Sequence, residues 1–320
     1  MADSGVEDTA RIVIFGCRTD FHRLVQCSTW VVDGTFKSAP ELWYQIWVIH
    51  GMFRGRVMPF VYALLPNKQQ CTYERALERI LSGIDDVRPG WRPTTLVIDF
   101  EKAEMNAFER LIPGIATHGC YFHFNQSIWR QIQNLGLSGF YLENAEFRSS
   151  LKCFAALAFL PVQDVQNAFN AIANGLIEDF QDGDEGEMTG AITNFLDYFE
   201  KNWVGRQRIN PRFPVRMWNC HDITLEGLPR TSNSAESWHH AFASIFNSHH
   251  PNPYKLVEGL LREQVRVDFT CTRLEAGEQV EQFSRIEYKQ ANERLLALIG
   301  ENRNGGDFLR ACTFYIHYGG

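Results

Sequence analysis

The stretch TWVVDGTFKSAP, residues 29–40, carries an apolar run directly into a carboxylate. Trp30, Val31 and Val32 are strong strand formers, and Asp33 and Gly34 follow them. This composition, closed by Gly and Pro, predicts a strand over residues 28–36. A charged group at the end of a buried strand is costly unless it is paired or holds a ligand. We therefore treat Asp33 as a candidate ligand-binding residue.

The segments that follow predict a sheet with helices. Residues 42–50 and 57–65 are rich in aromatic and β-branched residues, and their short connections predict an antiparallel meander with the first strand. Helical periodicity follows over 72–84 and 101–111, and further strands are predicted over 94–99 and 115–123. The fourth strand also runs into an aspartate, Asp99.

From about residue 124 the pattern becomes helical. Helices are predicted over 125–136, 145–158, 163–177, 187–202, 233–247, 253–273 and 279–299, with a Pro- and Arg-rich loop over 204–230. The pattern predicts an α/β fold with a mixed five-stranded sheet in the order 3-2-1-4-5, flanked by helices and interrupted by an all-α insertion. The expected organisation is an N-terminal segment (1–27), the first part of the core (28–124), a mainly helical insertion (125–228), and the closing helices of the core with a C-terminal helical region (229–320).

Composition limits the function classes. The 320 residues are 45% hydrophobic and 13% aromatic, which favours a folded chain with a large core. Eight scattered cysteines indicate reduced thiols in the cytosol or nucleus, and we expect neither a secretion signal nor a membrane-spanning helix. The net charge of −7 argues against simple DNA coating but permits a local basic groove.

Three acidic residues are the candidate metal ligands. The first and fourth strands would be neighbours, so Asp33 and Asp99 could lie within reach of one hard cation such as Mg²⁺ or Mn²⁺. A third carboxylate is expected from PRTSNSAESWHH, residues 229–240, where Ser232 could cap a helix that carries Glu236. Turn or capping roles remain alternatives for each residue. Four other acidic residues compete for the same roles: Asp85, Asp86, Glu101 and Glu104.

A Cys-x-x-His pair, Cys120 and His123, is predicted at the end of the fifth strand. Sulfur and imidazole could form half of a zinc site, with Cys220-His221 or His239-His240 as the other half by residue type alone. A purely structural role, or a phosphate contact from His123, remains open.

Nucleic-acid contacts could come from an aromatic residue and from arginines. Trp238 could stack on an unpaired base, although core packing is the alternative. Six arginines could contact phosphate or simply be surface residues: Arg130, Arg206, Arg208, Arg212, Arg216 and Arg230. The chain has no Gly-rich phosphate loop, no G-x-S-x-G and no H-E-x-x-H, which disfavours nucleotide triphosphatases, serine hydrolases and zinc proteases.

Five motifs in order resemble the Mutator-like element (MULE) transposase family: VVDGTFKSAP, YALLPNKQQCTYERAL, LVIDFEKAEMNAF, GCYFHFNQSIWRQIQ and RTSNSAESWHHAF. The resemblance covers roughly residues 28–250. It implies a ribonuclease H-like core with an Asp-Asp-Glu (DDE) triad, Asp33, Asp99 and Glu236, and a helical insertion before the Glu. The family's Cys-x-x-His corresponds to Cys120 and His123. Arg230, Asn233 and His239 fall in the segment around the Glu and, with Trp238, are candidate DNA contacts.

The resemblance further implies a nuclear DNA transposase that cuts and joins phosphodiesters with two Mg²⁺ or Mn²⁺ ions. Its expected partners are transposon terminal inverted repeats, target DNA and further copies of the chain in a dimer or larger oligomer. Family members usually carry an N-terminal zinc-type DNA-binding domain, for which the segment before Asp33 is too short. A catalytically silent, domesticated DNA-binding or regulatory protein is the main alternative, and a ribonuclease H-like nuclease acting on another nucleic acid is the second.

Overall fold

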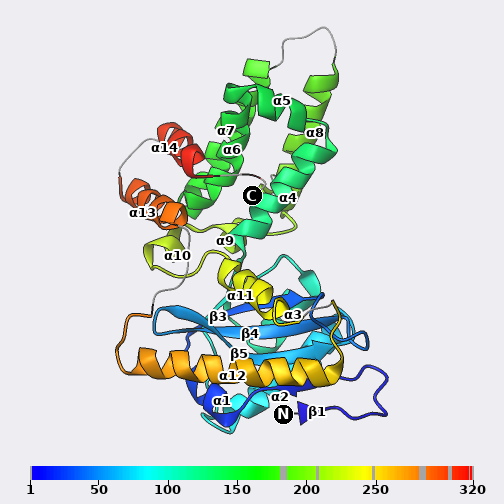
Figure 1. The fold of residues 1–320 in the computed structure, drawn as a ribbon. Helices are drawn as coiled ribbons and strands as arrows, with labels where there is room; N and C mark the ends of the chain where they lie inside the picture. The colour runs from blue at the N-terminus through cyan, green and yellow to red at the C-terminus, as the bar shows by residue number, and fades with distance from the viewer. Residues whose placement is uncertain are drawn as a thin grey trace. The chain divides into compact units, whose positions relative to one another are not determined.

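The computed structural model describes residues 2–180, 186–206, 209–246, 249–280, 286–301, 305–316 and 318. Contacts divide the chain into two compact units. The first comprises Met1–Thr117 and Thr231–Phe283, and the second comprises His118–Arg230 and Ser284–Gly320. The two units are drawn together in Figure 1, where the sheet belongs to the first unit.

The sheet has seven strands, so the expectation of five is wrong, whereas the mixed α/β class is confirmed. The strands are β1 (Ala2–Asp3), β2 (Val13–Phe15), β3 (Thr29–Thr35), β4 (Gln45–Phe53), β5 (Arg56–Leu65), β6 (Thr95–Ile98) and β7 (Ala116–Gly119). They lie in the order β1-β2-β5-β4-β3-β6-β7. The two additional strands extend the sheet beyond β5, where Val13 pairs with Leu64. A strand as short as β2 is stabilised by this pairing rather than by its own length.

The pairing around β3 is both antiparallel and parallel. β3 runs antiparallel to β4, with Asp33 opposite Val48, and parallel to β6, with Val31 opposite Val97. A parallel neighbour requires a long crossover, and the helix α2 (Gln70–Asp85) provides it between β5 and β6. The register places Asp33 and Asp99 at equivalent positions, each two residues beyond the paired valines.

Helices cover both faces of the sheet in the first unit. On one face, Trp238 and Phe242 of α11 (Asn233–Ala243) and Leu256 and Leu260 of α12 (Pro253–Glu275) pack against Val48 and other strand residues. On the other face lie α2 (Gln70–Asp85) and α3 (Lys102–Leu111), whose buried residues pack around Trp47. In Figure 1, α12 lies beside β5, which it contacts, and α1 (Arg18–Leu24) completes the unit.

The second unit is helical in the residues that the structure describes. Its main helices are α4 (Tyr121–Asn134), α5 (Ser138–Glu143), α6 (Ala145–Ala156), α7 (Val165–Phe180), α8 (Glu187–Phe199), α13 (Ile286–Gly300) and α14 (Gly305–Cys312). The stretch predicted as loop contains two short helices, α9 (Val215–Trp218) and α10 (His221–Leu225). Aromatic rings form the centre: Phe124 stacks on Trp218 at 4.8 Å and meets Trp203 edge-on at 4.8 Å.

The expected region 229–320, closing helices of the core and a C-terminal helical region, is divided between the two units: α11 and α12 belong to the first, and α13 and α14 belong to the second. α13 contacts α10, and α14 contacts α6 and α7. An amphipathic pattern identifies a helix but does not identify the surface against which it packs.

Among the described residues, no helix has the length and apolarity needed to cross a membrane.

Candidate active site

Asp33 lies near the C-terminal end of β3 and is only 7% exposed. The backbone N–H of Gly34 donates to its Oδ1 at 2.8 Å. A Cβ atom at position 34 would lie 2.5 Å from Oε1 of Gln45, which is itself buried and donates to the Tyr73 hydroxyl. Gly34 therefore leaves room for the buried Gln45 side chain, and its amide orients the Asp33 carboxylate.

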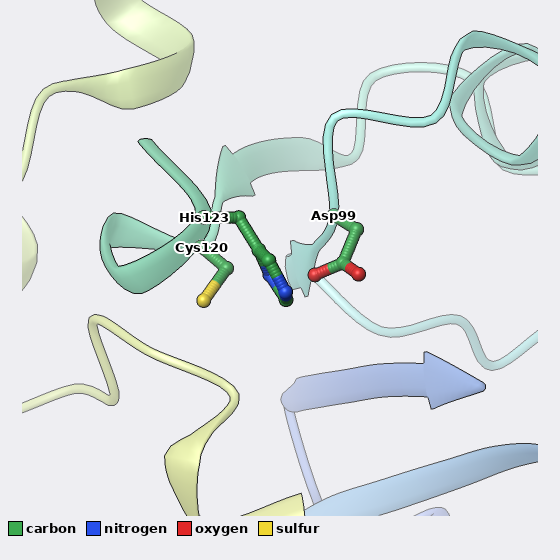
Figure 2. Close-up of side chains that lie close together, drawn as sticks. All are labelled: Asp99, Cys120 and His123. Carbon is green, nitrogen blue, oxygen red and sulfur yellow. The ribbon is translucent and has the colours of Figure 1, made fainter. Parts of the chain in front are cut away.

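Asp99 directly follows the short strand β6 and is half-buried (Figure 2). Side chains alternate along a strand, so Asp33 projects on the same face as Val31, and Asp99 continues the face of Val97. Because Val31 and Val97 are registered partners on parallel strands, the two aspartates extend from neighbouring positions of the sheet.

Glu236 reaches this face because α11 packs on it. Ala235, fully buried, forms a cluster with Val31 and Val97, and Glu236 is the next residue, half-buried in the first turn of the helix. Asp33, Asp99 and Glu236 therefore come from, or directly follow, three elements that pack together, β3, β6 and α11. Their role as metal ligands remains a prediction.

His239 connects α11 to β3. It lies about one turn beyond Glu236, and its Nε2 is 3.2 Å from Oδ2 of Asp33. Both side chains are close to fully buried, so His239 lies against the carboxylate on the helix side, while the Gly34 amide donates to it from the strand. His50 of β4 lies beneath, with its ring centroid 6.3 Å from that of His239.

His50 was not singled out from the sequence, although its position at the end of the apolar run LWYQIWVIH is unusual for a titratable residue. Burial, together with the neighbouring His239, lowers the pKa of His50 to about 3. His50 is therefore neutral at physiological pH and places an uncharged imidazole beside His239.

The four competing carboxylates have other roles. Glu101 pairs with Lys68 and accepts a hydrogen bond from the Tyr73 hydroxyl at 2.7 Å. Asp85 pairs with Arg92, whose hydrogen bond lowers the pKa of this carboxyl. Asp86 is the C-terminal capping residue of α2.

Glu104 is buried on the opposite face of the sheet, where the Trp47 indole N–H donates to it. Burial raises the pKa of Glu104 well above its usual value. The hydrogen bond from Trp47 lowers this pKa, whereas the negative charges of Asp99, Glu101 and Asp33 raise it further. This shift favours the protonated form of Glu104, which donates or accepts hydrogen bonds within the core.

Cys120 and His123 lie in a helix start, not at the end of a strand as predicted. β7 ends at Gly119, Cys120 is the N-cap of α4, and His123 lies in its first turn (Figure 2). Aromatic residues favour strands locally, but here Tyr121 and Phe124 are buried in the helical unit, and this packing decides the outcome. A ligand atom of Cys120 and one of His123 lie within 4.8 Å of each other.

The residues proposed to complete a zinc site with Cys120 and His123 have different surroundings. Cys220 belongs to the same unit and is fully buried, and burial raises the pKa of its thiol to about 12. His221 has its Nδ1 2.7 Å from Oδ1 of Asp222. His239 and His240 belong to the first unit. A zinc site at Cys120 and His123 stays a prediction.

The candidate DNA contacts also differ in their surroundings. Trp238 is 7% exposed, stacks on Phe242 at 4.8 Å and donates its indole N–H to Glu263, so its observed role is packing. Asn233 begins α11 and is half-buried. Arg230, in the second unit, has its guanidinium 5.2 Å from the Phe159 ring centre and bonds to Asn292.

The other arginines do not form one uniform group. Arg130, Arg212 and Arg216 are exposed, whereas Arg206 is paired with Asp197 and Glu200. Arg208 lies outside the residues that the structure describes. A continuous basic strip therefore stays a prediction.

Comparison with known proteins gives one assignment. Residues 29–127 match the family model described as the MULE transposase domain. The match begins at the first residue of β3 and includes Asp33, Asp99 and the Cys120–His123 pair. No curated protein matches the chain.

Proposed function

From the premise that this chain contains a MULE transposase domain, we propose that it cuts and joins DNA phosphodiesters by a metal-dependent DDE mechanism. The observation that carries the proposal is the packing of Ala235 on the registered pair Val31 and Val97. It explains how a glutamate more than a hundred residues distant in sequence joins two aspartates from neighbouring strands.

The residues present fit hard divalent cations. Carboxylate oxygens are the donors that Mg²⁺ and Mn²⁺ prefer, and the proposed ligands are three carboxylates. Two such ions, when bound, would favour attack by a hydroxyl and stabilise the leaving oxygen of a phosphodiester. Asp33, Asp99 and Glu236 would hold them, the Gly34 amide donates to the Asp33 carboxylate, and His239 lies beside it.

The proposal extends to fold type, partners and location. The sheet with β3 beside an antiparallel β4 and a parallel β6 is consistent with a ribonuclease H-like core. Transposon terminal inverted repeats and target DNA are the proposed substrates, and a dimer or larger oligomer is the proposed acting form. The proposed location is the nucleus, where these substrates occur.

The test is cleavage of supercoiled plasmid by the full chain with Mn²⁺ or with EDTA, followed by strand transfer of a duplex with a free 3′-hydroxyl. We expect Mn²⁺-dependent nicking that Asp33→Asn and Glu236→Gln each abolish. Asp86→Asn is the matched control, because Asp86 is exposed at the end of α2, and it should retain activity. Nicking that persists in EDTA, or that is equal in all variants, would contradict the proposal.

A further inference from the structure

Two exposed aromatic rings flank the loop that connects β3 to β4. Phe36 is 41% exposed and Tyr44 is 53% exposed, and their ring centres lie 5.3 Å apart in an edge-to-face arrangement. Given the proposed function, on which this inference rests, we propose that Phe36 and Tyr44 form a stacking platform for an unpaired DNA nucleotide beside the phosphodiester that is cut. Stacking on aromatic rings binds any base, because every base has a π-face.

The loop is fixed beneath its two rings. The Ala39 backbone N–H donates to the Phe36 carbonyl at 3.1 Å, and Ala39 itself is fully buried. His250 secures the loop from outside: its backbone N–H donates to the Lys37 carbonyl at 2.9 Å, and its Nδ1 lies 2.9 Å from the Ala39 carbonyl oxygen. The Tyr44 backbone N–H donates to Leu65 of β5. The platform is thus preorganised, which lowers the entropic cost of binding.

Charge near the rings favours a nucleotide over an apolar partner. The Lys68 ammonium lies 4.9 Å from the centre of the Phe36 ring, and Lys37 is exposed next to it in sequence. These two cations can contact a phosphate while a base stacks on a ring. Lys68 also pairs with Glu101, and the exposed Glu41 reduces the positive potential near the rings. The ring contacts would therefore contribute more to the affinity for DNA than the two lysine charges.

The position along β3 relates the platform to the acidic residues. Phe36 is three residues beyond Asp33, which is about 10 Å at the roughly 3.3 Å rise of a strand. Because side chains alternate along a strand, Phe36 projects toward the face of Trp47 and Asp33 toward the face of Val48. A DNA strand that reaches both therefore crosses the C-terminal edge of β3, and the stacked nucleotide would be a few positions from the phosphate at Asp33.

The experiment compares two DNA probes in EDTA, where no cutting occurs. One is a blunt duplex, and the other carries a four-nucleotide 3′ extension that contains 2-aminopurine. The full chain should bind the extended probe more tightly and quench its fluorescence. Phe36→Leu and Tyr44→Leu should each weaken that binding about fivefold or more and reduce the quenching, without changing affinity for the blunt duplex.

Tyr254→Leu is the matched control, since Tyr254 is 88% exposed on α12, and it should behave as the unaltered chain. The proposal is overturned if Phe36→Leu and Tyr44→Leu match this control, if they weaken both probes equally, or if the chain binds neither probe. The proposal is also overturned if Phe36→Leu or Tyr44→Leu changes the oligomer size of the protein without changing its affinity for DNA, because the two rings would then form a protein contact. If extension-specific binding is present but Mn²⁺-dependent nicking is absent, only the proposed reaction fails.

Discussion

The proposed site depends on a small residue at position 235. Ala235 is fully buried against Val31 and Val97, so the additional carbons of Ala235→Leu have no free space. Overpacking of this kind costs about 1–3 kcal/mol. For a unit of this size, that loss lowers the thermal midpoint by about 2–12 °C. Relief of the clash would displace α11, and with it Glu236, from the aspartates.

The assay combines calorimetry of the full chain with Mn²⁺-dependent nicking. A displacement of about 1 Å at a reacting centre can reduce the rate by about 100-fold, so activity should fall more sharply than stability. Ala241→Leu makes the same chemical change at an exposed position of α11, and its stability should stay within about 0.5 kcal/mol of the unaltered chain. If the two variants have equal thermal midpoints, α11 does not pack on β3 and β6 as described.

Three further predictions concern stability. Because burial raises the pKa of Glu104, stability should fall as pH rises from 4.5, the ordinary value, toward the folded value. Glu104→Gln should abolish this slope of about 1.4 kcal/mol per pH unit in metal-free thermal melts, and an unchanged slope would count against a buried acid. Trp238→Phe removes the donor to Glu263 and should cost about 1–3 kcal/mol in urea unfolding; no loss would show that the bond is not formed. Asn144→Ala removes the side-chain cap of α6 and should cost about 1 kcal/mol, whereas Asn144→Asp should not; equal losses would argue against capping.

Much of the sheet could be predicted because its strands carry their own signals. The apolar run before Asp33 and the one before Asp99 identify β3 and β6, and short connections identify β4 and β5. β2 could not be predicted, because a three-residue strand is stabilised by pairing with β5 and not by local composition. The helix start at Cys120 was missed for a similar reason, since the burial of Phe124 among distant tryptophans overrides a local strand preference.

The candidate site was predictable as residue types but not as an arrangement. Sequence alone left Glu101 and Glu104 as competitors of Asp99, and only their contacts with Lys68 and Trp47 separate them. His50 carries no motif, because its significance depends on the cross-strand position that places it beneath His239. Long-range packing of this kind is not encoded in a local pattern.

Asp33, Asp99 and Glu236 are proposed to hold divalent cations together. A crystal of the full chain soaked in Mn²⁺, with anomalous density measured at the manganese edge, tests this proposal. We expect density within about 2.0–2.3 Å of carboxylate oxygens from all three residues. Density elsewhere in the first unit, or none beside these carboxylates at a saturating concentration of Mn²⁺, would contradict the assignment.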